Sequence, residues 1–288
     1  NSLIDNLTKK GVLIKFLKDP KCNENLNIFN THVYFKNSEI SFVKKKFNKF
    51  ILNNLNSKDI EYEIKKQISL NEIQIRLREY IFMKKFRLDE FSKPHISIQG
   101  EGILKEVIKS GKPVIFVSGH FANFELMAME LEKKNINLCA IYRPLNNFLI
   151  NPFMVSIRKK YICRNQIKKG LAGTKDAIEF LKKKYSIALM VDQRLGESER
   201  YPFFNKSAHT TTLPAQLALK YNCKIIPIYL ERKQDSLFKM EILNPIDIKK
   251  TNDVEKDKIN ITIKINQIIE SMIKRNPGQW IWTHGRWK

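Results

Sequence analysis

The fold of this chain is decided by the stretch Pro113-Val-Ile-Phe-Val-Ser-Gly-His-Phe-Ala-Asn-Phe-Glu125. Its first part, 113–117, is a short run of β-branched and aromatic residues, which is typical of a buried strand. The next two residues break that pattern, and apolar residues then recur at helical spacing. His120 is therefore predicted at the carboxyl end of a strand, with Glu125 in the first turns of the following helix. In open α/β sheets this edge is where ligands bind.

Strands and helices alternate along the chain after residue 96. Short apolar runs predict strands, and apolar residues every three or four positions predict helices. The predicted strands span 113–117, 138–142, 187–191, 224–230 and 238–243, and the predicted helices span 102–109, 124–134, 149–161, 174–183, 212–221 and 254–274. This alternation predicts an α/β fold with a mixed, mostly parallel sheet and helices on both faces.

The first 95 residues differ from this pattern, and we interpret them as a small helical N-terminal region preceding an α/β domain at 96–288. Residues 1–39 are polar and rich in Asn, so we expect them to be loosely ordered or to form an edge element. A basic amphipathic helix is predicted from residue 40, and two more helices within 57–89. The apolar stripe of the first of these helices suits either an anionic membrane surface or, as we favour, the neighbouring domain.

The chain is strongly basic, with 52 Lys and Arg against 29 Asp and Glu and a net charge of +23. A field of this sign favours nucleic acid, an anionic membrane, an acidic protein or phosphorylated substrates, and the charge alone does not choose among them. The charge is diffuse, and no helix-turn-helix, RRM or zinc-finger pattern accompanies it. A nucleic-acid-binding protein is therefore the disfavoured alternative.

The four cysteines are far apart and form no C-x-x-C pair, so neither a zinc site nor a disulfide framework is predicted. Cys139 and Cys223 fall within apolar runs, where we expect them to be small core residues. No uncharged apolar run approaches the roughly 18 residues that a membrane span needs. As given, the chain is expected to be soluble or peripheral, and its start at Asn1 leaves room for an upstream anchor outside this sequence.

Polar side chains follow three of the predicted strands at the point where each strand ends. His120 follows the first strand, Arg143 the second, and Asp192 the strand at 187–191. If these strands are parallel, the three side chains emerge at one edge of the sheet. Taken singly, each has an ordinary interpretation: a turn histidine, a surface ion pair and a capping carboxylate. Their convergence favours a site.

An ordered set of sequence blocks makes the chain similar to a known family. The blocks are Ser-Gly-His-Phe-Ala-Asn-Phe-Glu at 118–125, Tyr-Arg-Pro at 142–144 with Asn-Asn at 146–147, Asp-Gln at 192–193, Tyr-Pro-Phe-Phe-Asn at 201–205 with Thr-Thr-Thr at 210–212, and Gln-Trp-Ile-Trp-Thr-His-Gly-Arg-Trp at 279–287. Over about 96–288 the chain resembles the lysophospholipid acyltransferase superfamily. Within it, the resemblance is to the late acyltransferases of lipid A biosynthesis, the lauroyl/myristoyl transferase group.

The resemblance implies an O-acyltransferase that moves a fatty acyl chain from an acyl carrier protein or coenzyme A thioester to a hydroxyl of a lipid A precursor or similar glycolipid. It implies no bound cofactor or metal. The partners it implies are acyl carrier protein, an anionic glycolipid or phospholipid acceptor, and the cytoplasmic face of the bacterial inner membrane. The same residues would also serve a phosphoinositide mannoside or lysophospholipid acceptor. Residues 1–39 lack the membrane-spanning anchor that family members usually carry, and Gly285 replaces a basic residue found in many relatives.

By this likeness, His120 and Glu125 match the catalytic His-x4-Asp/Glu pair, and Arg158 and Asp192 match two further required positions. Histidine, with an ordinary pKa of about 6.5, can accept the hydroxyl proton near neutral pH. A carboxylate on its other nitrogen would fix the tautomer, and we expect Glu125 in that role. Asp192 is expected to hold Arg158 or a neighbouring loop. The oxyanion donor is either Arg158 or the backbone N–H groups after His120.

Further residues are predicted around this pair. Substrate-binding candidates are Asn123, Arg143, Asn146, Arg164 and Gln193, and candidates for an acyl channel are Phe148, Phe153 and Met154. The basic run 158–169 suits an acidic carrier protein or glycolipid phosphates, although for Lys159 and Lys160 a solvated helix face is an equal alternative. The tryptophans near the C-terminus are interpreted as core rather than as an interfacial cluster.

Overall fold

A computed structural model describes residues 79–80, 82–91, 94–145, 151–196, 198–233, 237–281 and 285–287. The amphipathic helix predicted from residue 40 lies outside these residues, as do Asn146 and Phe148. Among the helices of the described residues, none is both long and apolar enough to cross a membrane.

The centre of the described part is a seven-stranded sheet with the order β1-β9-β8-β2-β5-β3-β4. Its strands are β1 (Ile96–Gln99), β2 (Ile115–Ser118), β3 (Leu138–Tyr142), β4 (Asn165–Lys168), β5 (Ser186–Met190), β8 (Ile225–Arg232) and β9 (Phe238–Ile242). The five strands from β8 to β4 are parallel to one another, while β9 runs antiparallel to β8 and is parallel to β1. The predicted α/β fold with a mixed, mostly parallel sheet is confirmed.

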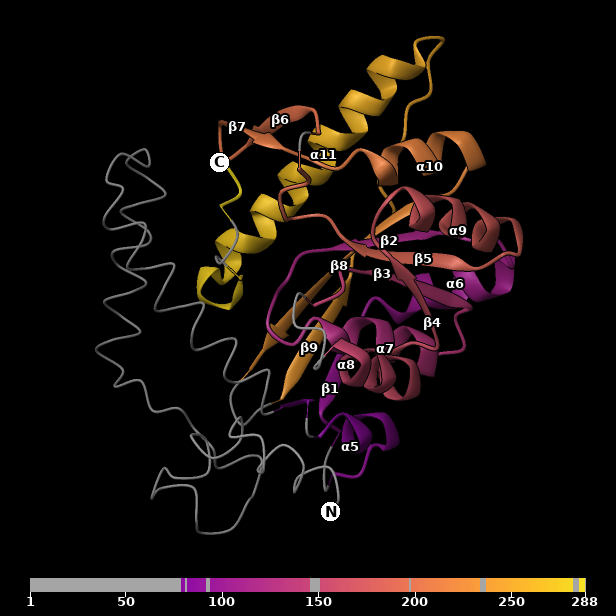
Figure 1. The fold of residues 1–288 in the computed structure, drawn as a ribbon, viewed down its shortest axis with the longest axis vertical. Coiled ribbons are helices and arrows are strands. Elements are labelled where there is room, and N and C mark those ends of the chain that lie inside the picture. The colour runs from indigo at the N-terminus through magenta and orange to yellow at the C-terminus, as the bar shows by residue number, and fades with distance from the viewer. Residues whose placement is uncertain are drawn as a thin grey trace.

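Helices cover both faces of this sheet (Figure 1). One side carries α5 (Met83–Leu88), α6 (Glu101–Ser110), α7 (Glu125–Lys133) and α8 (Asn151–Ile157), and the other carries α9 (Leu171–Lys182), α10 (Leu213–Tyr221) and α11 (Val254–Arg275). Because side chains alternate along a strand, the sheet has one hydrophobic core on each face. In β2, Phe116 packs on the face covered by α5 to α8, and Ile115 and Val117 pack on the face covered by α9 to α11. All residues of β2 are buried, as expected for a central parallel strand.

Three elements were not predicted from the sequence. The edge strands β1 and β4 have four residues each, and only one residue of β4, Ile167, is fully buried. β1 alternates apolar and polar residues over only four positions, and β4 has one buried apolar residue, so neither strand contains a continuous apolar run. The third element is the antiparallel hairpin of β6 (Arg200–Phe203) and β7 (Lys206–His209), which packs on α11, where the Asn266 amide donates to the Pro202 carbonyl at 2.8 Å.

Residues just before the predicted domain boundary already belong to the α/β core. Met83 and Phe86 of α5 are each 1% exposed and pack in the same core as α6 and α7. The division at residue 95 stays a prediction, because most of the preceding region lies outside the described residues. Cys139 and Cys223 are buried free thiols, so their predicted place in the core is confirmed.

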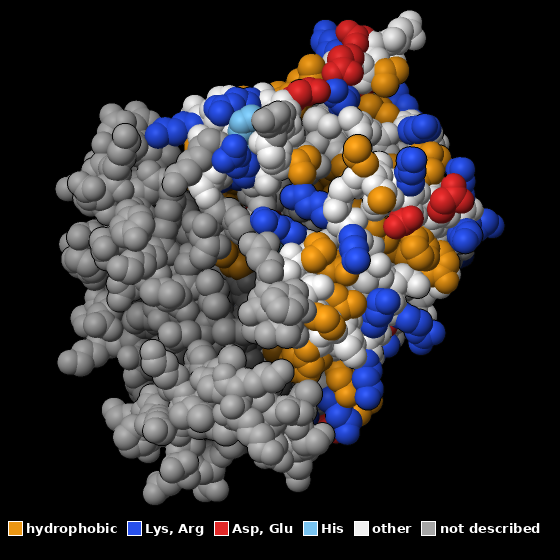
Figure 2. Space-filling model, in the orientation of Figure 1, with side chains coloured by type: hydrophobic (Ala, Val, Ile, Leu, Met, Phe, Trp, Pro, Cys, Tyr) orange, Lys and Arg blue, Asp and Glu red, His pale blue; other side chains and the backbone are white. Residues whose placement is uncertain are grey.

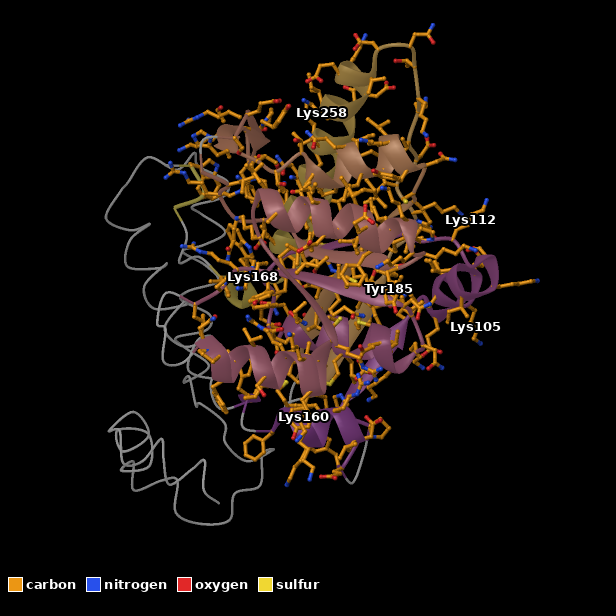
Figure 3. The ribbon with its side chains drawn as sticks, turned by 45° about the vertical axis from the view of Figure 1, so that its right-hand side comes forward. Lys105, Lys112, Lys160, Lys168, Tyr185 and Lys258 are labelled. Atoms are coloured by element: carbon orange, nitrogen blue, oxygen red, sulfur yellow. The ribbon has the colours of Figure 1, made fainter. Side chains whose placement is uncertain are left out.

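The basic charge is distributed widely. In Figure 2 the Lys and Arg side chains of the described surface are spread over the whole visible face and do not gather in one stripe. In Figure 3, Lys160 and Lys168 lie on separate parts of the surface, although both belong to the basic run at 158–169. A diffuse distribution of this kind gives a favourable general field for anions rather than a single groove.

Candidate active site

The three polar residues predicted to converge do leave the sheet at one edge. His120, Arg143 and Asp192 follow β2, β3 and β5, and these strands are parallel. β2 and β5 are neighbours, and their last paired residues are Ser118 and Met190. His120 and Asp192 each lie two residues beyond that pair, so the strand register places them opposite each other.

His120 and Asp192 form a closely bonded pair. Nδ1 of His120 lies 2.7 Å from Oδ1 of Asp192, and the backbone N–H of His120 donates to Oδ2 at 2.8 Å. Because a carboxylate can only accept, Nδ1 carries a proton, and in the neutral ring the lone pair is therefore on Nε2. No described residue hydrogen-bonds to Nε2, and the His120 side chain is 17% exposed. The imidazole is therefore held on one side and accessible on the other.

The carboxylate of Asp192 is strongly stabilised as an anion. Burial alone would raise the pKa of Asp192, but the nearby His120 and hydrogen bonds from His120 and the Trp280 indole lower it from 3.8 to about 2. Nε1 of Trp280 donates to Oδ2 at 2.6 Å. Trp280 is 2% exposed, so its predicted place in the core is confirmed, and its bond to Asp192 was not foreseen.

Glu125 does not occupy the position on His120 that the sequence predicted. It is the first residue of α7, and its Oε1 accepts from Nε of Arg158 at 2.9 Å and from Nη2 at 2.5 Å. The expected partners are thus exchanged: Asp192 holds His120, and Glu125 holds Arg158. The physical reason is the β2–β5 register, which brings Asp192 directly beside the imidazole.

Arg158 is positioned by a feature that periodicity does not reveal. α8 passes into a π-helical segment, Arg158–Ile162, and such segments are often found at functional sites. Arg158 is 9% exposed, and its guanidinium lies over the Tyr142 ring at 5.6 Å. Its burial would lower the pKa of Arg158, but Glu125 and Tyr80 raise it above the ordinary value. Arg158 therefore stays charged.

The loop after His120 has a constrained shape. A side chain at Gly119 would come within 2.7 Å of the Phe121 ring, so only glycine fits there. Ala122 has φ 41°, a left-handed conformation that is uncommon for a residue with a side chain. Asn123 is fully buried, and neither amide atom has a hydrogen-bond partner among the described residues. The loop thus carries both backbone strain and an unpaired amide beside the candidate base.

The C-terminal segment holds this loop from outside. The backbone N–H of Ala122 donates to Gln279 at 2.8 Å, and that of Ile281 donates to the His120 carbonyl at 3.1 Å. Phe121 and Trp280 form an isolated β-bridge. Further along, the buried Arg286 donates to Thr210 at 2.9 Å and lies over the Phe203 ring at 4.8 Å. The last residues of the chain are therefore part of the site's support.

The remaining predicted residues fall in different places. Arg143 and Gln193 lie at the carboxyl edge, where Arg143 is exposed and Gln193 half-buried. Arg164 precedes β4, so it lies at the opposite edge of the sheet from His120. In α8, Met154 is buried and Phe153 half-buried. The structure thus brings Arg143 and Gln193 to the edge that holds His120 and leaves Arg164 away from it.

Sequence reasoning missed Lys169 as an individual residue of the site. It follows β4 at the carboxyl edge, and its backbone N–H donates to the Tyr142 carbonyl at 2.8 Å. Burial and the neighbouring Arg143 lower the pKa of Lys169, while Asp192 opposes this shift. The signal for it was present, since the β3–β4 pairing places the end of the basic run beside Arg143. Two cations, Arg143 and Lys169, therefore lie at the same edge of the sheet as the candidate base.

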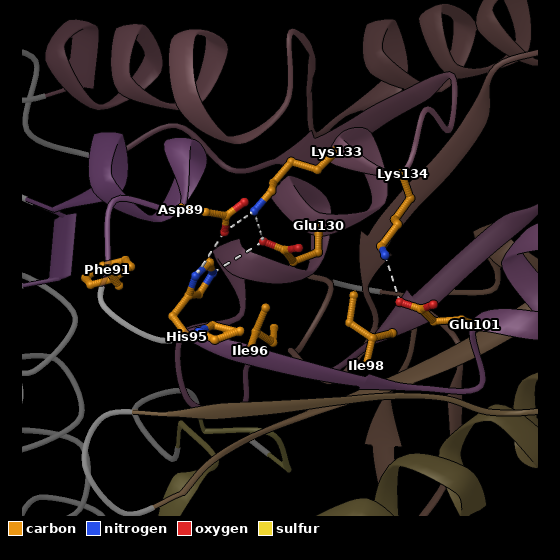
Figure 4. A pocket seen from close by; sticks show the side chains of 10 residues that line it. Asp89, Phe91, His95, Ile96, Ile98, Glu101, Glu130, Lys133 and Lys134 are labelled. Atoms are coloured by element: carbon orange, nitrogen blue, oxygen red, sulfur yellow. Dashed lines mark hydrogen bonds and ion pairs between the residues drawn. The ribbon is translucent and has the colours of Figure 1, made fainter.

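A separate cavity of about 520 Å³ lies near β1 and α7 and does not include His120 (Figure 4). Around His95 it holds the only group of described His, Cys, Asp or Glu side chains that could ligate a metal, with Asp89 and Glu130. The ammonium of Lys133 lies 2.7 Å from Asp89 and 3.0 Å from Glu130. Because a cation already lies between the two carboxylates, we interpret this cluster as an ion-pair network joining α5 to α7.

The fold and the site together define a class of protein: an α/β domain that presents a carboxylate-held histidine at the carboxyl edge of its sheet. The chain belongs to the bacterial lipid A biosynthesis acyltransferase family, whose profile matches residues 61–288. It is 28% identical over 212 residues to a lipid A biosynthesis acyltransferase of Haemophilus influenzae, covering 72% of this chain and 64% of that one.

A second relative is a lipid A biosynthesis palmitoleoyltransferase of Escherichia coli. The identity is 29% over 203 residues, which covers 66% of this chain and 61% of the relative. The chain therefore spans somewhat less than two thirds of the length of the curated relatives it matches. The predicted resemblance to the lipid A acyltransferases is confirmed at the level of the family.

Proposed function

We propose that this protein is an O-acyltransferase that moves a fatty acyl chain from a thioester to a hydroxyl of a lipid A precursor or a similar glycolipid. The observation that carries the proposal is the His120–Asp192 pair, in which the carboxylate holds Nδ1 and Nε2 stays available. Membership of the lipid A acyltransferase family supports the reaction class, and the names of the relatives support the acceptor.

In this reaction the acceptor oxygen attacks the thioester carbonyl and gives its proton to Nε2 of His120. Asp192 keeps the proton on Nδ1 and stabilises the imidazolium that forms. The tetrahedral intermediate then collapses, the carbon–sulfur bond breaks, and the imidazolium returns its proton to the leaving thiolate. The acceptor hydroxyl is itself the nucleophile, so no acyl-enzyme intermediate forms.

The oxyanion of the tetrahedral intermediate needs fixed donors. Two buried donors near the site have no hydrogen-bond partner among the described residues: the Asn123 amide and Nη1 of Arg158. A buried donor without a partner is unfavourable unless a ligand satisfies it. We assign oxyanion stabilisation to these two groups. Glu125 then acts by holding Arg158 rather than by holding His120.

The cations beside the site suit anionic groups on both substrates. Arg143 and Lys169 would bind phosphates of the acceptor glycolipid, and the diffuse positive field would attract an acidic acyl carrier protein or coenzyme A. Phe153 and Met154 remain candidates for contact with the acyl chain. We place the protein at the cytoplasmic face of the inner membrane, peripherally or through an anchor outside this chain, with no bound cofactor.

The test is acyl transfer from a radiolabelled thioester into a panel of detergent-dispersed acceptors. The donors are acyl carrier protein and coenzyme A thioesters, and the acceptors are a lipid A precursor, lysophospholipids and glycolipids. Wild type is run beside Glu125→Ala and beside Glu179→Ala, a control on α9 whose side chain is 59% exposed and pairs with Lys182.

We expect label to enter the lipid A precursor with wild type and Glu179→Ala, and Glu125→Ala to lose transfer. Entry into a lysophospholipid instead would keep the reaction and replace the acceptor. A folded wild type that transfers label to no acceptor from either donor would overturn the proposal.

A further inference from the structure

A tyrosine from the segment before the sheet reaches the Glu125–Arg158 pair. The Tyr80 hydroxyl donates to Oε1 of Glu125 and accepts from Nη2 of Arg158 at 3.3 Å. Tyr80 is 45 residues from Glu125 and 78 residues from Arg158 in sequence. The three side chains close a triangle in which each contacts the other two. This contact ties a remote segment of the chain to the functional pair.

The hydrogen bonds to Glu125 are concentrated on one oxygen. Tyr80 and two nitrogens of Arg158, Nε and Nη2, donate to Oε1, and none of the described residues donates to Oε2. Three donors on one oxygen fix the rotation of the carboxylate. Without the Tyr80 hydroxyl, only Arg158 would define that orientation.

The residue before Tyr80 anchors the same segment on a second strand. Glu79 is 6% exposed, and its carboxylate accepts from Nη2 of Arg232 at 2.9 and 3.1 Å. Arg232 is the last residue of β8, and its backbone exchanges two hydrogen bonds of 2.7 Å with the Gln279 side chain. Gln279 in turn accepts from the Ala122 N–H in the loop after His120. Tyr80 thus contacts the Glu125–Arg158 pair, and the adjacent Glu79 is linked through Arg232 and Gln279 to the loop after His120.

The Tyr80 hydroxyl remains a donor at all ordinary pH values. Burial and the neighbouring Glu125 raise the pKa of Tyr80 well above its usual value, and Arg158 only partly opposes this. A phenol beside a carboxylate therefore keeps its proton and shares it with Glu125. The orientation that it imposes is constant over the range in which an acyl thioester can be assayed.

We propose that Tyr80 is a positioning residue that holds the Glu125–Arg158 pair in its active arrangement, an inference that rests on the proposed acyl transfer. It does not touch the reacting atoms but acts through Arg158 and Glu125. Loss of the Tyr80 hydroxyl leaves the Glu125–Arg158 ion pair in place but less well oriented. We therefore expect kcat to fall and KM to change little.

The first experiment compares Tyr80→Phe with Tyr185→Phe in the full chain. Tyr185 is a half-buried tyrosine packed on Phe180, and it precedes β5, at the opposite edge of the parallel strands from His120. We expect Tyr80→Phe to lower kcat about tenfold with KM within twofold of wild type, and Tyr185→Phe to leave both unchanged. Full kcat in folded Tyr80→Phe would overturn the inference. If that variant does not fold, Tyr80→Leu, which also lacks the hydroxyl, takes its place with the same expected loss of kcat.

The second experiment does not depend on activity. Free energies of unfolding in urea are measured for wild type, Tyr80→Phe, Glu125→Gln and the double variant, which together form a double-mutant cycle. In a control cycle, Tyr185→Phe replaces Tyr80→Phe. We expect the first cycle to be non-additive and the control cycle additive. An inactive wild type with a non-additive first cycle would refute the acyl transfer while leaving the Tyr80 contact intact. An additive first cycle would refute the role of Tyr80.

Discussion

Two histidines of the described residues, His120 and His95, lie against carboxylates, and they differ in whether a ring nitrogen is accessible. His120 at the carboxyl edge gives Nδ1 to Asp192 at 2.7 Å and is 17% exposed, with no described residue bonded to Nε2. His95 at the start of β1 is 1% exposed. Its Nδ1 lies 3.3 Å from Asp89 and its Nε2 lies 3.4 Å from Glu130. His120 therefore has one accessible ring nitrogen, whereas His95 is buried with a carboxylate near each of its ring nitrogens.

The difference separates a candidate base from a structural residue. A base needs one nitrogen fixed and the other able to reach a proton, which His120 satisfies. His95 packs against the Phe86 and Phe91 rings, at centroid distances of 5.0 and 5.4 Å, and each of its nitrogens has a carboxylate nearby. The type of residue and its acidic neighbours therefore do not identify a catalytic histidine. The open nitrogen does.

The largest effect is expected at His120. His120→Gln removes the proton acceptor, and we expect transfer to fall by about 10³-fold or more, because general-base catalysis contributes on that order. The fold should remain, since the ring is partly exposed and its backbone bonds to Asp192 and Ile281 persist. Steady-state transfer assays and a thermal melt of the same preparation measure both. Turnover near the wild-type rate would remove the base assignment.

Asp192→Asn is expected to lower kcat about 10³-fold while the protein still folds, since an amide can hold the wrong tautomer of His120. Glu125→Gln is the informative comparison, because Glu125 contacts Arg158 rather than the imidazole. A large fall in kcat for Glu125→Gln with little change in kcat for Asp192→Asn would support the pairing of Glu125 with His120 that was expected from the sequence.

Asp192→Asn also tests, through the free energy of unfolding, whether the Asp192 carboxylate is stabilised as an anion. Its pKa is lowered in the folded state, so its contribution of about 2 kcal/mol should be present above pH 4 and lost as the pH falls towards 2. The unfolding free energies of wild type and Asp192→Asn should therefore converge between pH 4 and pH 2. A constant difference across this range would show that the carboxyl is not stabilised as an anion.

A smaller effect is expected at Trp280. Trp280→Phe keeps an aromatic ring but removes the 2.6 Å bond to Asp192, and we expect kcat to fall about tenfold, as for the loss of one bond to a charged group. Trp287→Phe is the matched control, because that indole donates to the Phe203 carbonyl at 2.9 Å. Equal kinetics for the two variants would show that the indole does not orient Asp192.

The sequence predicted the sheet and the convergence of three strand ends, because apolar runs and parallel order determine where His120, Arg143 and Asp192 emerge. It did not predict which carboxylate meets the imidazole. That depends on the β2–β5 register, which the residue pattern does not specify. The contacts of Tyr80 and Trp280 join segments far apart in the chain, so no local spacing announces them. Arg158 was found through the family resemblance, while its π-helical segment was not foreseen.

The smallest effect on activity is expected at His95, where the comparison between the two histidines is tested from the other side. His95→Gln leaves Glu130 with Lys133 as its partner, so the cluster loses one buried member but keeps an ion pair. We expect a loss of about 2 kcal/mol in the free energy of unfolding, measured by urea denaturation, with kcat within twofold of wild type. His120→Gln should show the reverse: a large loss of kcat and little loss of stability. A fall in kcat for folded His95→Gln like that of Asp192→Asn would mean that an enclosed histidine also serves the reaction, and the open nitrogen would no longer distinguish the two.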